Sequence, residues 1–119
     1  MPGSQGEDLA VRFLQRQGFK ILERNYACRS GEIDIIACEG DTVCFVEVKA
    51  RSSDDYGGPQ AAVTKKQMRR IVNAALFYLG RKGVPEVDCR FYVVAVRGGG
   101  DEPGVELYRD AFYPDIQLS

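Results

Sequence analysis

The sequence predicts an α/β fold, a mixed β-sheet with helices packed against it, in the element order α-β-β-β-α-β-β. Apolar residues recur at helical spacing after two capping boxes, which start at Ser4 and Thr64. Two short apolar runs between these helices, Ile33–Cys38 and Val43–Val48, are spaced as the strands of a β-hairpin. A third apolar run, Cys89–Val96, follows the second helix and predicts a further strand.

The first half of the chain predicts one helix and three strands. Ser4 is the expected N-cap of the first helix, with Glu7 at its third position, and Gly18 is expected to end it. The segment 19–26 follows as the first strand. Gly40-Asp41 is a two-residue turn signal, so the hairpin register is expected to pair positions whose numbers sum to 81.

The second half predicts a helix and two strands. Thr64 and Gln67 form the second capping box, and Gly83 and Pro85 are expected to end the helix. We expect its apolar face to consist of Met68, Ile71, Val72, Ala75, Leu76 and Leu79. A glycine-rich turn over 97–104 then leads to an edge strand over 105–109.

Composition limits the classes of function that the chain can have. At 119 residues it is expected to form one domain, 1–119, large enough to bury a core without disulfides. The absence of histidine excludes Ser-His-Asp and Cys-His catalysis and histidine-ligated zinc. The four cysteines have no C-x-x-C spacing, so neither a zinc site nor disulfides are expected. With no signal peptide and no apolar run long enough for a membrane span, we expect a cytoplasmic protein.

The hairpin carries charged residues where a sheet core is expected. In the predicted register Asp34 lies opposite Glu47, Glu32 lies opposite Lys49, and the side chains of Asp34, Glu47 and Lys49 point the same way. Two carboxylates about 5 Å apart repel by roughly 3 kcal/mol at an effective dielectric near 20. A bound Mg²⁺ or Mn²⁺ ion relieves that repulsion. The alternative is an edge strand with solvated charges, but both faces of Val43–Val48 are apolar, which favours an interior strand.

Several motifs give the chain a resemblance to a known family. They are Gly6-Glu7, Arg24-Asn25-Tyr26, Gly31-Glu32-Ile33-Asp34, the segment Phe45–Arg51, Lys66-Gln67 and Asp110-Ala111-Phe112. Together they resemble the YraN-like family of small bacterial predicted nucleases, in the PD-(D/E)xK superfamily. One departure is Arg90-Phe91-Tyr92, where family members commonly carry Arg-Phe-Asp. The role of that aspartate is therefore in question in this chain.

The resemblance implies a restriction-endonuclease-like fold and Mg²⁺- or Mn²⁺-dependent cleavage of phosphodiester bonds. Asp34 and Glu47 would hold the metal, and Lys49 would act with them in catalysis. Similarity to resolvase-like members makes Glu7 a further candidate ligand, although a helix-capping role alone also accounts for it. Glu32 is a supporting candidate, with simple pairing to Lys49 as the alternative.

Nucleic acid, specifically DNA, is the expected partner. Residues 61–82 carry six cations and no acid, so the exposed face of the second helix would repel itself unless phosphates neutralised it. The expected contacts to the nucleic acid are Arg51, Lys66, Gln67, Arg69 and Arg70. An ordinary solvated surface is the alternative for the cations, and a capping role alone for Gln67.

The predicted function is a metal-dependent endonuclease acting on DNA, including structured or junction DNA. Two alternatives keep the same fold: a non-catalytic nucleic-acid-binding module and a protein-interaction adaptor. The complete acid-acid-lysine set counts against the adaptor. Resolvase-like relatives suggest a homodimer, and no membrane partner is expected.

Overall fold

The computed structural model describes residues 2–51, 63–83, 87–97 and 104–113, and the side chains of residues 2–4 and 51 are outside that description. Its element order is the predicted one. The elements are α1 (Pro2–Arg16), β1 (Lys20–Cys28), β2 (Gly31–Glu39), β3 (Thr42–Arg51), α2 (Lys65–Lys82), β4 (Asp88–Arg97) and β5 (Gly104–Tyr108). The sequence also predicts a polar, glycine-containing loop over 51–60. That loop, the predicted turn over 97–104 and Pro85 lie wholly or largely outside the described residues.

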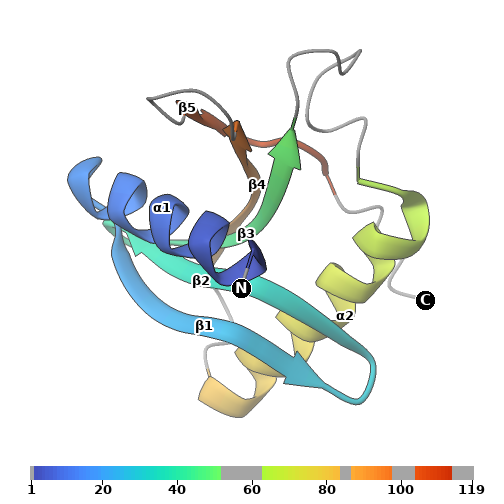
Figure 1. Cartoon of the computed structure of the whole chain (residues 1–119). Helices are drawn as coiled ribbons and strands as arrows, with labels where there is room; N and C mark the ends of the chain where they lie inside the picture. Colours follow the sequence, from blue (N-terminus) through green and yellow to red (C-terminus); the bar gives the residue numbers. More distant parts are fainter. Residues whose placement is uncertain (1, 52–62, 84–86, 98–103, 114–119) are drawn as a thin grey trace.

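The five strands in the described segments form one mixed sheet in the order β1-β2-β3-β4-β5 (Figure 1). Strands β3 and β4 pair in parallel, and the other neighbouring pairs are antiparallel. The parallel pair needs a crossover connection, which contains α2. β5 lies at the edge of the sheet, as the sequence predicts.

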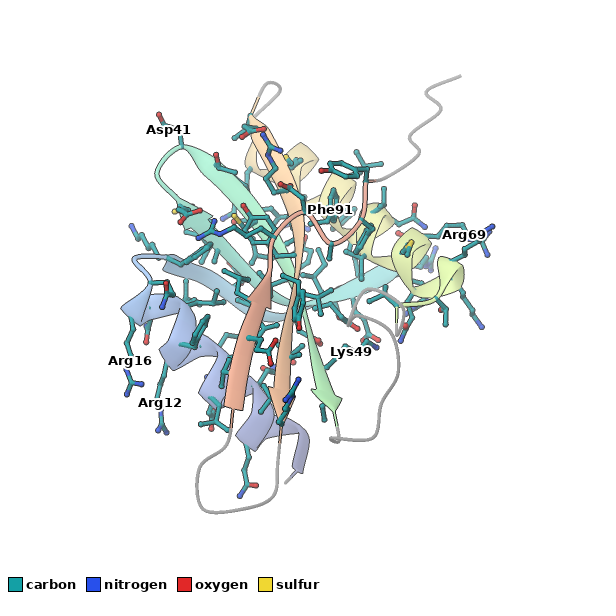
Figure 2. All side chains as sticks on the ribbon, turned by 90° about the horizontal axis from the view of Figure 1, so that it is seen from above. Arg12, Arg16, Asp41, Lys49, Arg69 and Phe91 are labelled. Atoms are coloured by element: carbon teal, nitrogen blue, oxygen red, sulfur yellow. The ribbon has the colours of Figure 1, made fainter. Side chains whose placement is uncertain are left out.

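The two helices cover opposite faces of the sheet, and each closes its own core (Figures 1 and 2). Ala10 and Leu14 of α1 pack on one face, against inward side chains of β2, β3 and β4. On the other face, Tyr78 of α2 packs edge-to-face on Phe45, which stacks on Phe91. The buried, two-sided strands β3 and β4 are therefore interior strands, as the apolar pattern of Val43–Val48 indicates.

The start of α1 differs from the prediction. The helix begins at Pro2, so Ser4 is not its N-cap and the predicted capping box is wrong. Proline suits a first helical position, because it lacks an N–H that would have no partner there. The predicted end is confirmed: Gly18 has φ +100°, its N–H donates to the Gln15 carbonyl, and the Phe19 N–H donates to the Leu14 carbonyl.

The predicted ends of α2 are confirmed, but the prediction of its apolar face is wrong at one residue. Thr64 and Gln67 form both hydrogen bonds of the capping box, and Gly83 follows the helix with φ +66°. Leu76, expected in the core, is 47% exposed. The buried residues are Ile71, Ala74, Ala75 and Tyr78. At about 100° per residue, Leu76 lies on the far side of the helix from that stripe.

The hairpin register is confirmed from the turn to the middle of the strands. Gly40 has φ +60°, and the pairs run from Glu39–Thr42 to Ile35–Val46, all summing to 81. The ladder ends at Ile35–Val46, so the expected pair of Asp34 and Glu47 is not part of it, and the expected pairing of Glu32 with Lys49 is wrong. Glu32 instead pairs with Ala27 of β1, and Lys49 pairs with Ala95 of β4.

No helix in the described segments is long and apolar enough to cross a membrane.

Candidate metal and nucleic-acid site

A small cavity lies between the ends of β2 and β3 and the first half of α2. Its lining residues are Glu32, Asp34, Glu47, Gln67, Arg70 and Ile71. Two of the three residues predicted to be catalytic, Asp34 and Glu47, therefore share one cavity. The third, Lys49, is also on the α2 side of β3 (Figure 2), with its Nζ 3.3 Å from the Glu47 Oε2.

Asp34 is fixed by the backbone of the neighbouring strand. Its Oδ2 accepts a hydrogen bond from the Val48 N–H at 2.8 Å. This bond lies just beyond Ile35–Val46, the last pair of the β2–β3 ladder. A side-chain carboxylate thus takes over a backbone donor where regular pairing ends, and it holds Asp34 beside the Glu47–Lys49 segment.

Glu47 is held in an environment that disfavours its negative charge. Its side chain is 15% exposed, and that of Lys49 is 19% exposed. Burial, a hydrogen bond with Asp34 and the charge of Asp34 together raise the pKa of Glu47 to about 8, although Lys49 acts in the opposite direction. Without a further cation, the site therefore favours a protonated Glu47 at neutral pH.

The donor set fits a hard divalent cation. Asp34 and Glu47 supply carboxylate oxygens, and the described residues contain no group of three or more His, Cys, Asp or Glu side chains placed to hold a metal. Two carboxylates are few for zinc or calcium. They suit Mg²⁺, which keeps much of its coordination shell for water and phosphate oxygens. A cation there would also offset the burial and the charge of Asp34, which both raise the pKa of Glu47.

The distance between α2 and the sheet is set by a glycine at the start of β2. Gly31 is buried, and a Cβ built on it would lie 1.8 Å from the carbonyl oxygen of Arg70. No other residue type allows the two backbones to come so close. Gly31 therefore permits Arg70 and Gln67 to reach the cavity that holds the two acids.

Glu32 and Gln67, both expected near the site, line the cavity. Glu32 is exposed there, whereas Gln67 also takes part in the N-terminal cap of α2. Its side-chain oxygen accepts the Thr64 N–H at 3.1 Å, which completes the helix cap. The capping role and the site role that the sequence left as alternatives are thus compatible.

Glu7 lies outside the cavity lining. Its carboxylate accepts a hydrogen bond from the Asn25 side chain at 2.9 Å and lies 3.5 Å from the Arg24 guanidinium, which also pairs with Asp8 at 2.6 Å. Asn25 has φ +54° and precedes Tyr26, which pairs with Ile33 of β2. Glu7 therefore ties α1 to the strand beside Asp34, and its role as a metal ligand stays a prediction.

The cations expected to contact nucleic acid divide into two groups. Arg70 lines the cavity, while Lys66 and Arg69 are exposed outside it on α2. Arg69 extends away from the sheet (Figure 2). The side chain of Arg51 is outside the described residues.

Tyr92, where family members commonly carry aspartate, lies away from the site. Tyr92 is 5% exposed in the core beneath α1, on the opposite face of the sheet from the acids. The Arg109 guanidinium lies over the rings of Tyr92 and Phe19 and binds both carboxylate oxygens of Glu39. This cluster fixes Arg109, the residue after β5, to the turn side of the hairpin.

Sequence reasoning missed two features of the site. One is the Asp34–Val48 hydrogen bond, which only the end of the strand pairing reveals. The other is the backbone contact of Gly31, for which the glycine directly before Glu32 was an available signal.

A family model described as "Uncharacterised protein family UPF0102" matches residues 6–96 of this chain. A UPF0102 protein of Geobacter metallireducens is 48% identical over 110 residues, which cover 92% of this chain and 90% of the relative. One of Syntrophus aciditrophicus is 50% identical over 110 residues, covering 92% and 87%. One of Chlorobium chlorochromatii is 54% identical over 94 residues, covering 79% and 72%. The range matched by the family model includes the cavity residues and all of α2.

Proposed function

We propose that this chain, which belongs to the UPF0102 family, is a metal-dependent endonuclease that hydrolyses phosphodiester bonds in DNA. The observation that carries the proposal is the partly buried set of Asp34, Glu47 and Lys49 in one small area beside a cationic helix. The mixed sheet with a helix on each face supports a restriction-endonuclease-like fold and a place in the PD-(D/E)xK superfamily.

Asp34 and Glu47 would hold Mg²⁺ or Mn²⁺. Such an ion supplies Lewis-acid polarisation of a phosphate oxygen and activation of a water molecule. The protein's own part is to present two carboxylates on adjacent strands, with Asp34 held by the Val48 N–H. The main-chain carbonyl of Val48, beside Glu47, is a candidate third oxygen donor.

Lys49 supplies a fixed positive charge at the same place. Its Nζ lies 3.3 Å from Glu47, so its position is set by the carboxylate it pairs with. Once Glu47 is engaged by a cation, the ammonium group is free to orient the attacking water or to stabilise negative charge that develops on the phosphate. Its side chain is largely buried, which makes that electrostatic contribution larger than it would be in water.

The substrate backbone would lie along α2. Arg70 lines the cavity with the acids, and its guanidinium would bind a phosphate oxygen next to the scissile one. Lys66 and Arg69 extend this cationic surface away from the cavity. Structured or junction DNA is a candidate substrate, and the screen below separates it from simple duplex.

The test is a cleavage screen over single-stranded, duplex, flap and four-way-junction DNA with Mg²⁺ or Mn²⁺. We expect cleavage of at least one form, its loss in EDTA and its loss in Asp34→Asn. Asp41→Asn is the matched control, because Asp41 is an exposed turn residue of the same hairpin (Figure 2). Cleavage that persists in Asp34→Asn would reject the site.

A second candidate function is a nucleic-acid-binding module without turnover. It is favoured by the six cations of α2, which would provide phosphate contacts whether or not the acids bind metal. Tight, metal-independent binding without cleavage of any form in the screen would support this alternative.

A further inference from the structure

One side of α2 carries a continuous row of residues that starts at the cavity. At about 100° per residue, positions spaced by three or four lie one above another on a helix. The row consists of Lys66, Arg70, Asn73, Phe77 and Arg81. All five are exposed, and Arg70 lines the cavity with Asp34 and Glu47. The row therefore runs from the candidate catalytic site along the surface of the helix.

Phe77 is the unexpected member of this row. It is 44% exposed and belongs to neither of the two cores. The guanidinium of Arg81 lies 5.7 Å from the centre of its ring. An aromatic ring among cations, presented at the surface, is the arrangement by which proteins bind single-stranded nucleic acid: the cations follow the backbone and the ring stacks on a base.

The charge on α2 identifies the kind of partner. The helix has four cations in its first half, Arg81 and Lys82 at its end, and no acid. A second copy of the chain docked through the same face by a two-fold axis would place these cations opposite one another. A polyanion is attracted by the same surface. The exposed ring therefore fits a polynucleotide better than it fits a second copy.

The distance from the cavity to the ring corresponds to a few nucleotides. Arg70 and Phe77 are seven residues apart, which is about 10 Å along a helix axis at about 1.5 Å per residue. Stacked nucleotides of one strand rise by about 3.4 Å each. A strand with a phosphate at Arg70 would thus bring a base to Phe77 about three nucleotides away. In a continuous duplex that base would be stacked between its neighbours, so the contact requires an unpaired base.

We propose that Phe77 stacks on an unpaired base of the bound strand and that the substrate carries a single-stranded segment about three nucleotides from the phosphate at the cavity. This inference rests on the proposed function for the identity of the partner as a polynucleotide. It adds the form of nucleic acid and a specificity residue that lies outside the acid-acid-lysine set.

The test measures binding in EDTA, so that it does not depend on cleavage. Fluorescence anisotropy would compare three labelled DNA probes: a 12-nucleotide single strand, a blunt duplex and a duplex with a short single-stranded overhang. In Phe77→Ala we expect at least about fivefold weaker binding to the single strand and the overhang, and less than about twofold change for the blunt duplex. Phe77→Trp should keep wild-type binding, because the ring is retained.

Leu76→Ala is the matched control. Leu76 is 47% exposed on the same helix, but about 100° around it from Phe77, outside the row. We expect Leu76→Ala to leave binding to all three probes unchanged. Both substitutions introduce alanine, the best helix former, at an exposed position, so both variants should fold.

Three results would overturn the inference. They are unchanged single-strand binding in Phe77→Ala, an equal loss of binding to the blunt duplex, and a change from dimer to monomer in Phe77→Ala by light scattering, which would assign the ring to a second copy.

Failure of this inference is distinguishable from failure of the proposed function. Selective loss of single-strand binding without cleavage of any substrate would support the inference and reject the nuclease. Cleavage by the wild type together with unchanged single-strand binding in Phe77→Ala would support the nuclease and reject the inference.

Discussion

Gly31 at the start of β2 lies directly against the backbone of Arg70 in α2, so closely that a Cβ on residue 31 would be 1.8 Å from the Arg70 carbonyl oxygen. This contact sets how deeply α2 sits on the sheet. It also places Arg70 in the lining of the cavity that Asp34 and Glu47 share. The same two backbones therefore determine both the packing of the helix and the geometry of the site.

Gly31→Ala should destabilise the protein by roughly 1–3 kcal/mol, because the added methyl group must push α2 away from β2. Urea denaturation measures the change in the free energy of unfolding. Gly6→Ala is the control: Gly6 lies in α1, a Cβ there meets nothing within 4 Å, and alanine should stabilise the helix by about 0.5–1 kcal/mol. Equal stability of Gly31→Ala and wild type would contradict the close contact.

Glu47→Gln should make the metal-free protein more stable, increasingly so between pH 4.5 and about 8. The pKa of Glu47 is raised from 4.5 to about 8 in the folded state. Below pH 4.5 both states hold the proton. Between the two values the unfolded state releases it first, so wild-type stability falls as pH rises, whereas glutamine does not titrate.

Thermal unfolding in EDTA at pH 5 and pH 8.5 measures this difference. The gain in the variant should be larger at pH 8.5, reduced in part by the loss of the Lys49 ion pair. Glu106→Gln serves as the control, because Glu106 is exposed in an ion pair with Arg97 on the edge strand. A variant that is less stable than wild type at pH 8.5 would contradict the raised pKa of Glu47.

Metal binding should depend on both Asp34 and Glu47. Calorimetry with Mn²⁺ should detect weak binding to the wild type and none to Asp34→Asn or Glu47→Gln, because each variant removes one of two carboxylates. Glu7→Gln tests the remaining candidate ligand. Since Glu7 bonds to Asn25 rather than lining the cavity, we expect that variant to retain most of the Mn²⁺ affinity. Unchanged Mn²⁺ affinity in both Asp34→Asn and Glu47→Gln would show that the metal binds at another place.

The architecture was more predictable from sequence than the site. Apolar periodicity gave both helices, and the Gly40-Asp41 turn gave the hairpin register, because strand alternation carries that register from the turn as far as Ile35–Val46. The register alone put Asp34 and Glu47 on one face of the sheet. It could not show that the β2–β3 pairing stops before these residues, where the Asp34 side chain accepts the hydrogen bond of the Val48 N–H.

The errors have physical causes of the same kind. Leu76 has the spacing of a core residue, but the direction of the buried stripe of α2 is set by its contacts with the sheet. Gly31 lies against Arg70 and Phe45 lies against Tyr78, and both strand residues are far from α2 in the sequence. Glu7 has the spacing of a capping-box residue, yet its carboxylate accepts a hydrogen bond from Asn25 of β1. Local patterns predict elements, whereas the contacts between elements decide which side chains reach the cavity.

Neutralising the cations of α2 should weaken DNA binding by a similar factor for different sequences. If Lys66, Arg69 and Arg70 each contact a phosphate, the triple alanine variant should flatten the salt dependence of affinity by about one unit of slope per contact. Arg12 and Arg16 are the matched control, because they extend from α1 on the opposite side of the sheet (Figure 2). Their double alanine variant should keep the wild-type salt dependence of DNA affinity. An unaltered salt dependence in the α2 triple variant would show that the cations of α2 are solvated and contact no phosphate.

Lys49→Ala should remove most cleavage while leaving metal and DNA affinity nearly intact. The Lys49 ammonium pairs with Glu47 at 3.3 Å but supplies no oxygen to a cation, so it is not needed to hold one. Its charge becomes important when negative charge develops on the phosphate, which is the signature of an interaction made mainly in the transition state. Single-turnover cleavage of the substrate from the screen measures the loss. Lys49→Arg should rescue little, because a planar guanidinium places its charge differently from a compact ammonium. A wild-type cleavage rate in Lys49→Ala would mean that the acid-acid-lysine mechanism does not operate in this protein.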